Sequence, residues 1–542
     1  MRAAISALLA LPLVAIQLQA QPSVSSGDLE RAGATITAEK LMTRIRALAN
    51  DSMLGRGPGQ RGDTLTTRYL EGEMSRIGLT PAGADGFRQP VSLHRAKAAA
   101  AFRITAGGRE VGLRQDSEIF LNAETIGAAR LDDAPLVLVG HGIDAPEFRW
   151  NDYKARSLAG KVALILDAEP EQLARRSFAP NSGVTYHAMW FLRARYALAR
   201  GASAVIMVRS GPDSVHAKRA RRAQHDALIS EHASTVPSGD FLIQISASAA
   251  DRLARSIGDS LAGWRKVAAD SSFNPVDIPI RISVEQRVTS TPFVSNNLVG
   301  IIRGSDPRLR DECVVYVAHW DGYGIGPAVA GDSIYNGALD NAGGVSSMLA
   351  IAEGIRRVPR APARTIVFLA TTAEESGTLG ADAYVANPVC PMSSTQLAVG
   401  LDWTWTWGRT PLITSNGFGY STVDSLAADV AQRVGKSFGP GWADYWMASD
   451  QSAFLTRGVP SWFGGLDGDV IGKPKGWAMQ QLMTTATHIP GDEILSTWDM
   501  SGSAEETRFL MRLGVAAAEM QTHLRWTVDS EFARAAARRA TR

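Results

Sequence analysis

The stretch from Val314 to Glu375 decides the fold, because three of its segments place a reactive side chain after an apolar run or inside a glycine-rich turn. They are V-V-Y-V-A-H-W-D (314–321), N-G-A-L-D-N (336–341) and F-L-A-T-T-A-E-E (368–375). In α/β proteins, reactive groups gather beyond the carboxyl ends of the strands. The stretch therefore predicts an α/β sheet with a reactive centre at one of its edges.

Periodic segments on both sides of this stretch extend the pattern. Apolar residues at helical spacing predict helices over 37–48, 64–77 and 343–356. Apolar runs predict buried strands over 364–370 and 397–403. Strands that alternate with helices predict an α/β fold with a mixed, mostly parallel sheet flanked by helices.

Size and charge narrow the class of protein. A chain of 542 residues with 45% hydrophobic residues predicts a globular protein of two or more domains. Its formal net charge of +2 gives no reason to expect nucleic acid or an anionic membrane as a partner. The densest basic run is expected to be a solvated helix face or loop, and it contains Lys218, Arg219, Arg221 and Arg222.

The first twenty residues have the pattern of a secretory signal peptide. Arg2 precedes an apolar run over 7–16, and Leu18-Gln19-Ala20 then leads into polar residues. We expect cleavage after Ala20 and export to a periplasm or beyond. The run is shorter than the roughly 20 residues that span a bilayer, and no later stretch predicts a membrane span.

Cys313 and Cys390 are the two cysteines of the chain. Export to an oxidising compartment would permit a disulfide between them. Two buried free thiols remain the alternative. No C-x-x-C motif for zinc or redox chemistry is present.

Five side chains within the deciding stretch could carry chemistry. His319 ends an apolar run, and Asp321 two residues later could hold the second N–H of its ring. Asp340 lies between glycines and directly before a helix, so a metal ligand and a helix N-cap are both open. Of Glu374 and Glu375, one could bind a metal while the other acts as a base on metal-bound water. A metal-dependent hydrolase is the hypothesis that unites them.

Two later residues complete an ordered set. Asp402 closes the apolar run A-V-G-L-D, and His488 lies in T-H-I-P-G-D-E. The order H-x-D, D-N, E-E, D, H resembles peptidase family M28, whose members are co-catalytic zinc metallopeptidases and mostly aminopeptidases. The resemblance includes R-G-P-G-Q-R-G (56–62) and S-D-Q-S-A-F-L-T-R-G-V-P (449–460), and it extends from about residue 35 to residue 524.

This resemblance implies a zinc exopeptidase-like fold and two Zn²⁺ ions. His319 and Asp402 would hold one ion, Glu375 and His488 the other, and Asp340 would bridge them. Glu374 would be the general base for zinc-bound water, and Asp321 would support His319. The implied reaction removes the N-terminal residue from a peptide with a free N-terminus. The oligomeric state stays open.

A second resemblance concerns the segment between the two halves of the peptidase. A strand and G-x-G-I turn over 134–143, W-x-D-Y at 150–153 and Gly160-Lys161 resemble the protease-associated domain, and an unrelated α/β insert is the alternative. The expected division is a signal peptide (1–20), an N-terminal part of the peptidase domain (35–130), the insert (131–285) and the main peptidase domain (286–530).

The sequence departs from the M28 pattern at two positions. Gln451 stands where members usually have His, and Thr487 stands where many have Tyr. Since a tyrosine there can stabilise the tetrahedral oxyanion, Tyr445 is a candidate substitute.

The alternating W-T-W-T-W run also bears on the substrate pocket. If 402–408 continues a strand, Trp403, Trp405 and Trp407 share a face away from Asp402 and pack in the core. Trp442 and Trp446 are then the better candidates for the pocket wall. A preference for apolar or bulky N-terminal residues follows as a hypothesis.

Other activities remain open on the same scaffold. A carboxypeptidase or dipeptidase would need a basic clamp for the substrate carboxylate, and the sequence does not place one. A glutaminyl cyclase typically uses a single zinc. A non-catalytic, receptor-like relative would have lost ligands, whereas the full set is present here.

Overall fold

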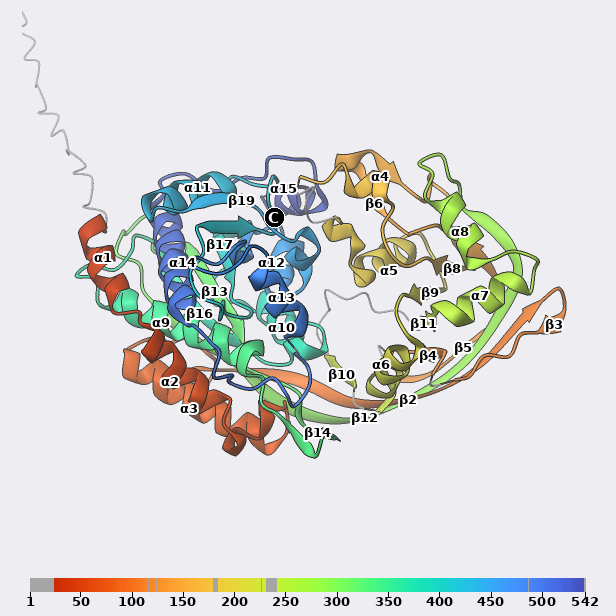
Figure 1. The fold of residues 1–542 in the computed structure, drawn as a ribbon, viewed down its shortest axis with the longest axis horizontal. Helices are drawn as coiled ribbons and strands as arrows, with labels where there is room; N and C mark the ends of the chain where they lie inside the picture. The colour runs from red at the N-terminus through yellow and green to blue at the C-terminus, as the bar shows by residue number, and fades with distance from the viewer. Residues whose placement is uncertain are drawn as a thin grey trace, which may run out of the picture.

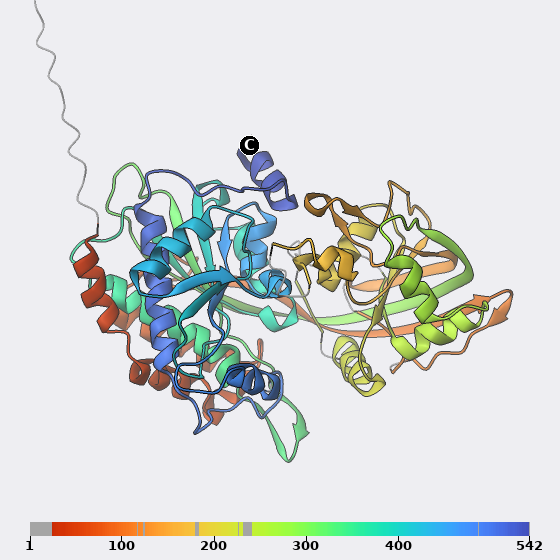
Figure 2. The same ribbon diagram turned by 45° about the horizontal axis from the view of Figure 1, so that its top comes forward.

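The computed structural model shows two lobes joined by one continuous 14-stranded sheet (Figures 1 and 2). It describes residues 24–115, 117–122, 125–178, 184–225, 227–230, 241–485 and 487–540. The predicted signal peptide lies outside the described residues. None of the helices in the described part of the chain combines the length and hydropathy needed to cross a bilayer.

The first lobe is built on a short parallel core. Strand β13 (Cys313–His319) lies between β16 (Thr365–Thr371) and β17 (Thr395–Gly400), and all three are parallel. Beyond β17 lies β20 (Ser461–Trp462), and beyond β16 the antiparallel β12 (Val276–Ile302). This mixed sheet with flanking helices confirms the predicted fold class.

Both faces of this core are covered, which explains why its strands are continuously apolar. Side chains alternate across the sheet, so Val314 and Tyr316 face one cluster and Val315 and Val317 the other. The first face packs on α2 (Ala38–Leu48), α3 (Arg61–Ile77), α9 (Gly344–Arg356), α11 (Val423–Arg433) and α14 (Ser501–Glu519). The second packs on α10 (Leu379–Ala386) and α12 (Gln451–Thr456).

Two long strands carry the sheet from the first lobe into the second. β2 (Arg88–Ala106) pairs with β12 along its whole length, and both pass beneath the two lobes in Figure 1. The second lobe then adds the parallel strands β5 (Gly127–Leu138), β8 (Val162–Ile165), β9 (Ala204–Arg209) and β11 (Leu242–Ser246), with β4 (Ile119–Leu121) at the edge. Its helices are α4 (Glu171–Ala174), α5 (Trp190–Leu198), α6 (Asp213–His225), α7 (Ala247–Arg255) and α8 (Leu261–Ala268).

The proposed division at residues 131 and 285 remains a prediction. Both positions lie inside strands, β5 and β12, which belong to the continuous sheet. The protease-associated resemblance of the second lobe likewise stays a prediction.

Smaller elements complete the structure. They are α1 (Ser26–Ala34), α13 (Trp477–Thr484), α15 (Glu531–Ala540), β1 (Thr80–Pro81), β3 (Arg109–Glu110), β6 (Asp144–Ala145), β7 (Trp150–Asn151), β10 (Ala227–Ser230), β14 (Gly324–Val329), β15 (Asp332–Tyr335), β18 (Leu412–Ser415), β19 (Ser437–Pro440) and β21 (Gly464–Asp467).

The two cysteines form a disulfide in the structure. Cys313 at the start of β13 is bonded to Cys390, which follows α10, with the Cα atoms 6.3 Å apart. Of the two alternatives left open by the sequence, the paired form is the one present.

Candidate metal centre

Three neighbouring strands deliver the first reactive side chains to one edge of the sheet. His319 is the last residue of β13, and Glu374 and Glu375 begin a 3₁₀ turn after β16. Asp402 follows β17 by two residues. The three strands are parallel neighbours, so their carboxyl ends meet at the same edge, as the sequence predicted.

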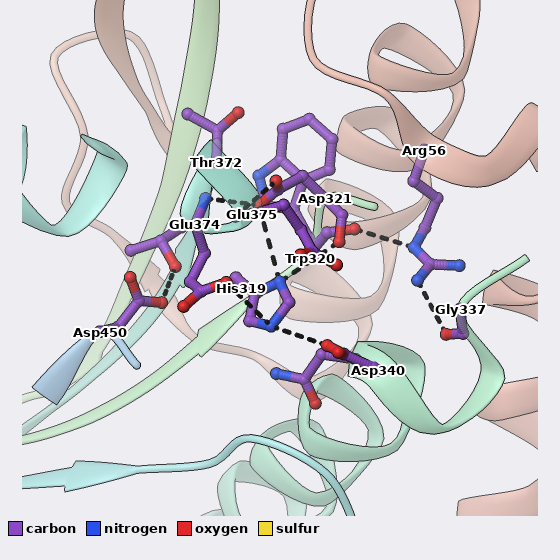
Figure 3. Close-up of polar contacts among 12 residues, drawn as sticks. Arg56, His319, Trp320, Asp321, Gly337, Asp340, Thr372, Glu374, Glu375 and Asp450 are labelled. Atoms are coloured by element: carbon purple, nitrogen blue, oxygen red, sulfur yellow. Dashed lines mark hydrogen bonds and ion pairs between the residues drawn. The ribbon is translucent and has the colours of Figure 1, made fainter. Parts of the chain in front are cut away.

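The predicted ligands form two groups that share Asp340. His319, Asp340 and Asp402 make one group, and Asp340, Glu375 and His488 make the other, with the ligand atoms of each group within 4.8 Å of one another. Nε2 of His319 lies 3.3 Å from Oδ1 of Asp340 (Figure 3). The same nitrogen lies 3.4 Å from Asp402. Nε2 of His488 lies 2.9 Å from the other oxygen of Asp340 and 3.4 Å from Glu375. The two carboxylate oxygens of Asp340 thus face different histidines.

Charge makes this arrangement unfavourable without cations. His319 is fully buried, and Asp340 and Asp321 are buried beside it. Burial alone would lower the pKa of His319, but the carboxylates of Glu374 and Asp402 outweigh it and raise that pKa well above its ordinary value. Burial would raise the pKa of Asp340, yet hydrogen bonds with His319 and His488 hold it well below its usual range. The concentrated negative charge and the nitrogen–oxygen donor set fit zinc.

Asp321 positions the two glutamates. Its carboxylate accepts hydrogen bonds from the backbone N–H groups of Glu374, at 3.0 Å, and Glu375, at 3.4 Å. Nδ1 of His319 lies 3.2 Å from the backbone oxygen of Asp321 and 3.7 Å from its carboxylate. Asp321 therefore contacts the ring nitrogen that faces away from the ligand group.

Glu374 is a carboxylate that belongs to neither ligand group and lies on the Nε2 side of His319, where the ligands gather. Its Oε2 lies 3.8 Å from Nε2 of His319, and its side chain is 11% exposed. Burial raises the pKa of Glu374 well above its usual value, with the charge of His319 opposing that rise and the charge of Asp402 adding to it. A carboxyl group with a raised pKa can both take up and release a proton near neutral pH.

The turn that carries Asp340 is held from outside the deciding stretch. Asp492 accepts from the backbone N–H groups of Leu339, at 2.9 Å, and Asp340, at 3.0 Å. Asn341 donates to the backbone oxygen of Leu401 at 2.9 Å, and its own side-chain oxygen accepts from Trp403 N–H. These contacts replace the N-cap alternative, because α9 begins later, at Gly344.

Arg56 explains why the glycine-rich segment 56–62 lies near the site. Its buried guanidinium donates to the backbone oxygens of Trp320 and Gly337, both at 2.9 Å (Figure 3). It also donates to the backbone oxygens of Asn336 and Leu48. Burial lowers the pKa of Arg56, while the charges of Asp492, Asp321, Asp340 and Glu375 oppose that shift. One cation thus fixes the backbone beside the metal centre and offsets part of its negative charge.

The S-D-Q segment lies directly against the centre. Asp450 accepts a hydrogen bond from the hydroxyl of Thr371, and burial raises its pKa to about 7. Gln451 is fully buried, and its amide donates to the backbone oxygen of Trp446 at 3.0 Å. The residue that replaces the usual histidine therefore packs inside the lobe.

A cavity of about 970 Å³ opens on the metal centre, and both lobes line it. Trp190 and Arg219 come from the second lobe, whereas Tyr323 and Tyr445 come from the first. Tyr323 packs on His488 with ring centroids 5.0 Å apart, and Tyr445, the oxyanion donor suggested by the sequence, is 44% exposed.

The tryptophan prediction is wrong in part, because Trp407 belongs to a buried core cluster and Trp405 packs against it, yet neither is excluded from the cavity wall. Trp403, Trp405 and Trp407 all line the cavity, because β17 ends at Gly400 and the alternation of a strand does not apply beyond it. Trp403 has a φ of +72°, which no continuing strand would have. Of the two alternatives, Trp442 lines the cavity, and Trp446 is 1% exposed within an aromatic cluster.

Sequence reasoning missed three supporting residues. Arg56 and Asp492 lie inside segments that the sequence analysis quoted, and Asn341 directly follows Asp340. A single sequence does not show which backbone groups such side chains will reach, and these groups lie up to 281 residues away. The one signal for such supporting residues in the sequence is a polar residue, expected to be buried, beside a predicted ligand.

Comparisons with known proteins agree with this geometry. Residues 297–507 match the description of Peptidase family M28. No curated protein sequence matches the chain.

Three of the solved structures that this chain is similar to are described as aminopeptidases or as an M28 peptidase. The aminopeptidase from Aneurinibacillus sp. strain AM-1 is 17% identical, with 91% of this chain and 96% of that chain covered and a TM-score of 0.47. The zinc aminopeptidase BSAP from Bacillus subtilis is 19% identical, with 89% and 94% covered and a TM-score of 0.41. An M28 peptidase precursor from Shewanella amazonensis SB2B is 19% identical, with 92% and 98% covered and a TM-score of 0.44.

These TM-scores lie below 0.5, and the three similarities carry no conclusion about activity. The family match stands independently of them. It spans His319, Asp340, Glu375, Asp402 and His488, together with Glu374. Residues 297–507 of the chain are therefore similar to peptidase family M28.

Proposed function

We propose that this chain is an exported di-zinc aminopeptidase that removes N-terminal residues from peptides. The single observation that carries the proposal is the pair of ligand groups that share Asp340, with Glu374 beside them. Two groups joined by one carboxylate fit two ions at neighbouring positions.

His319, Asp340 and Asp402 would hold one ion, and Asp340, Glu375 and His488 the other. Bound zinc would polarise the scissile carbonyl and make a water nucleophilic at neutral pH. Asp321 fixes the backbone of both glutamates, and Arg56 and Asp492 fix the turns on either side of Asp340. The ligands are therefore held in place by hydrogen bonds from the protein itself.

Glu374 moves the proton in this mechanism. Its carboxylate takes a proton from the attacking water and gives it to the departing amine, so it is base first and acid afterwards. Both steps need a group whose pKa lies near the working pH, and burial shifts the pKa of Glu374 in that direction. Its partial exposure to the cavity gives the substrate access to it.

The charge of the cavity favours a substrate with a free amino group. Among the described residues that line the cavity there are six carboxylates, whereas Arg219 is the one arginine and there is no lysine. Bound zinc would offset the charge of the ligands Asp340, Glu375 and Asp402, and the carboxylates of Glu374 and Asp467 remain to attract a protonated N-terminus. The carboxylates are Asp340, Glu374, Glu375, Asp402, Asp467 and Glu506.

A dipeptidase or carboxypeptidase remains the second candidate, because Arg219 could bind a substrate carboxylate from the second lobe. A glutaminyl cyclase with one zinc is less compatible with the group formed by Asp340, Glu375 and His488.

One substrate panel tests the proposal. Leucine p-nitroanilide with a free amine should be hydrolysed by the zinc-loaded protein, and its N-acetylated form should not. A chelator should abolish the activity, and zinc should restore it with two ions per chain. Cleavage of N-blocked peptides from the carboxyl end would overturn the aminopeptidase assignment, and one zinc per chain at full activity would overturn the di-zinc assignment.

The export proposal has its own test, because it concerns residues outside the described structure. The protein recovered from the periplasm or medium should begin at Gln21. A cytoplasmic protein with an intact N-terminus would overturn it.

A further inference from the structure

A second acidic position lies in the cavity apart from the metal centre. Glu506 on α14 is half-buried, lines the cavity and belongs to neither ligand group. The mechanism proposed above does not use it. A buried carboxylate is unfavourable unless something compensates its charge, so its presence here requires an explanation.

Within the protein, Glu506 is bound by backbone groups alone. Oε1 accepts from Leu466 N–H at 2.9 Å, and Oε2 accepts from Trp405 N–H at 3.3 Å. No ion pair among the described residues includes Glu506. Its neighbour Glu505 differs, because it pairs with Lys436 at 2.8 Å and Arg409 at 3.2 Å.

The surroundings leave the carboxylate accessible from the cavity. Gly465 on β21 also lines the cavity, and a Cβ atom there would lie 1.7 Å from Oε1 of Glu506. Glycine at this position leaves the space that Oε1 of Glu506 occupies. The buried hydroxyl of Thr404, on the same cavity wall, has no hydrogen-bond partner in the described structure.

The distance between Glu506 and the metal centre suits a substrate with a long side chain. Trp405 N–H, which contacts Glu506, lies three residues after the ligand Asp402. Each residue advances the chain by at most about 3.6 Å, so Trp405 lies within roughly 11 Å of Asp402. Glu506 is one hydrogen bond farther away. Trp403, Leu466 and Leu510 also line the cavity and offer apolar surface to a methylene chain.

We propose that this end of the cavity receives the side chain of the substrate's N-terminal residue, and that Glu506 selects lysine or arginine there. The inference rests on the aminopeptidase function proposed above. The buried carboxylate would pair with the ammonium or guanidinium group, while the tryptophan and leucine walls contact the aliphatic stem. It replaces the apolar or bulky preference suggested by the sequence.

The kinetic test compares two substrates that differ chiefly in charge, lysine and norleucine p-nitroanilides. The zinc-loaded wild-type protein should show a kcat/KM at least about 10-fold higher for lysine. Glu506→Gln should abolish that preference by reducing the lysine value while leaving the norleucine value within about 3-fold. Glu505→Gln, which removes a charge from the same helix turn outside the cavity, should leave the preference intact.

A binding measurement separates this inference from the aminopeptidase proposal. Free L-lysine should bind the zinc-loaded protein at least about 10-fold more tightly than L-norleucine in calorimetry, and Glu506→Gln should remove the difference. If the protein bound lysine more tightly than norleucine but hydrolysed neither anilide, the aminopeptidase proposal would be wrong and the selection by Glu506 would stand. Equal handling of both ligands by the wild type would overturn the selection by Glu506.

Folding of the variants is checked by circular dichroism. If Glu506→Gln fails to fold, Glu506→Asp keeps the charge but retracts it by one methylene. It should then retain a preference for lysine that is weaker than that of the wild type. An Asp variant whose lysine-to-norleucine ratio equals that of the wild type would contradict direct contact with the substrate.

Discussion

Glu374 is the residue whose replacement tests the chemistry most directly. Gln has nearly the same shape, and the N–H that Asp321 holds belongs to the backbone. Glu374→Gln should therefore lower kcat by roughly 10²–10⁴-fold, the usual contribution of a general base. Zinc content, measured by mass spectrometry, should stay at the wild-type value, because Glu374 belongs to neither ligand group. Loss of zinc together with activity would show that Glu374 is a ligand.

Glu506 also affects stability, and the direction follows from its pKa. Burial raises that pKa from 4.5 to about 7. The folded state therefore binds the proton more tightly than the unfolded state, and this stabilisation is present below pH 4.5 and lost as the pH rises through about 7. Between pH 5 and pH 8, the free energy of unfolding of Glu506→Gln should rise relative to the wild type by up to roughly 3 kcal/mol.

Denaturant unfolding of both proteins at the two pH values measures this difference. Glu505→Gln is the control, since Glu505 is the neighbouring residue on α14 and is paired with Lys436. A difference between wild type and Glu506→Gln that does not change with pH would contradict burial of the charge. The expected result would mean that the fold keeps a destabilising carboxylate at neutral pH, as a binding residue would require.

At the scale of elements, the turn before α9 depends on one acid from a distant loop. Asp492 accepts two successive backbone N–H groups, including that of the bridging ligand Asp340. In Asp492→Asn one acceptor oxygen becomes an NH₂ group that faces a donor. Zinc affinity should fall roughly 10–100-fold, as for other residues that orient a ligand.

Competition with a chromogenic chelator measures this loss of affinity. Asp469→Asn is the matched control, because Asp469 is exposed in the same part of the chain and accepts only from Gly476 N–H. Equal zinc affinity in Asp492→Asn and the wild type would show that the turn holds its shape without Asp492.

Some of the elements could be predicted from the sequence and others could not. Strands such as β13 and helices such as α9 were predictable, since each is an apolar or periodic run that local physics determines. The segment after β17 was not, because Asn341 and Glu506 bind its backbone and turn it out of the sheet. The sequence predicted five ligand candidates, and the structure brings them together in two groups that share Asp340. Arg56 was not predictable, because it acts through carbonyl groups whose position depends on the complete fold.

At the scale of the whole molecule, the disulfide links two parts of the first lobe. Cys313 and Cys390 are separated by 77 residues that include His319, Asp340, Glu374 and Glu375. Closing a loop of this length stabilises the fold by about 4–5 kcal/mol in the chain-entropy treatment. Reduction should lower the denaturant midpoint accordingly, and the double variant with Ala at both positions should lose its response to reductant. A wild-type midpoint that reductant leaves unchanged would contradict the bond.

The cavity belongs to both lobes, so the second lobe should influence which peptides are cleaved. Arg219 on α6 is exposed and is the one arginine among the described residues that line the cavity. It reaches the cavity from the opposite lobe to the metal ligands, where the far end of a short peptide would lie. The basic run was expected to be a solvated face, and this member of it also contributes a positive charge to the cavity.

Arg219→Gln should therefore raise KM for dipeptides and tripeptides with a free carboxylate by roughly 5–10-fold, the worth of an exposed charge pair of about 1 kcal/mol or slightly more. The same peptides with an amidated C-terminus, and aminoacyl anilides, should be unaffected, because they carry no charge for Arg219 to meet. Lys218→Gln serves as the control, since Lys218 is exposed on the same helix but does not line the cavity.

If Arg219→Gln abolished activity on every substrate with a free carboxylate while N-blocked peptides were cleaved by the wild type, Arg219 would be the clamp of a carboxypeptidase. A KM effect confined to short free peptides would instead make the second lobe a length selector for an aminopeptidase whose chemistry lies wholly in the first.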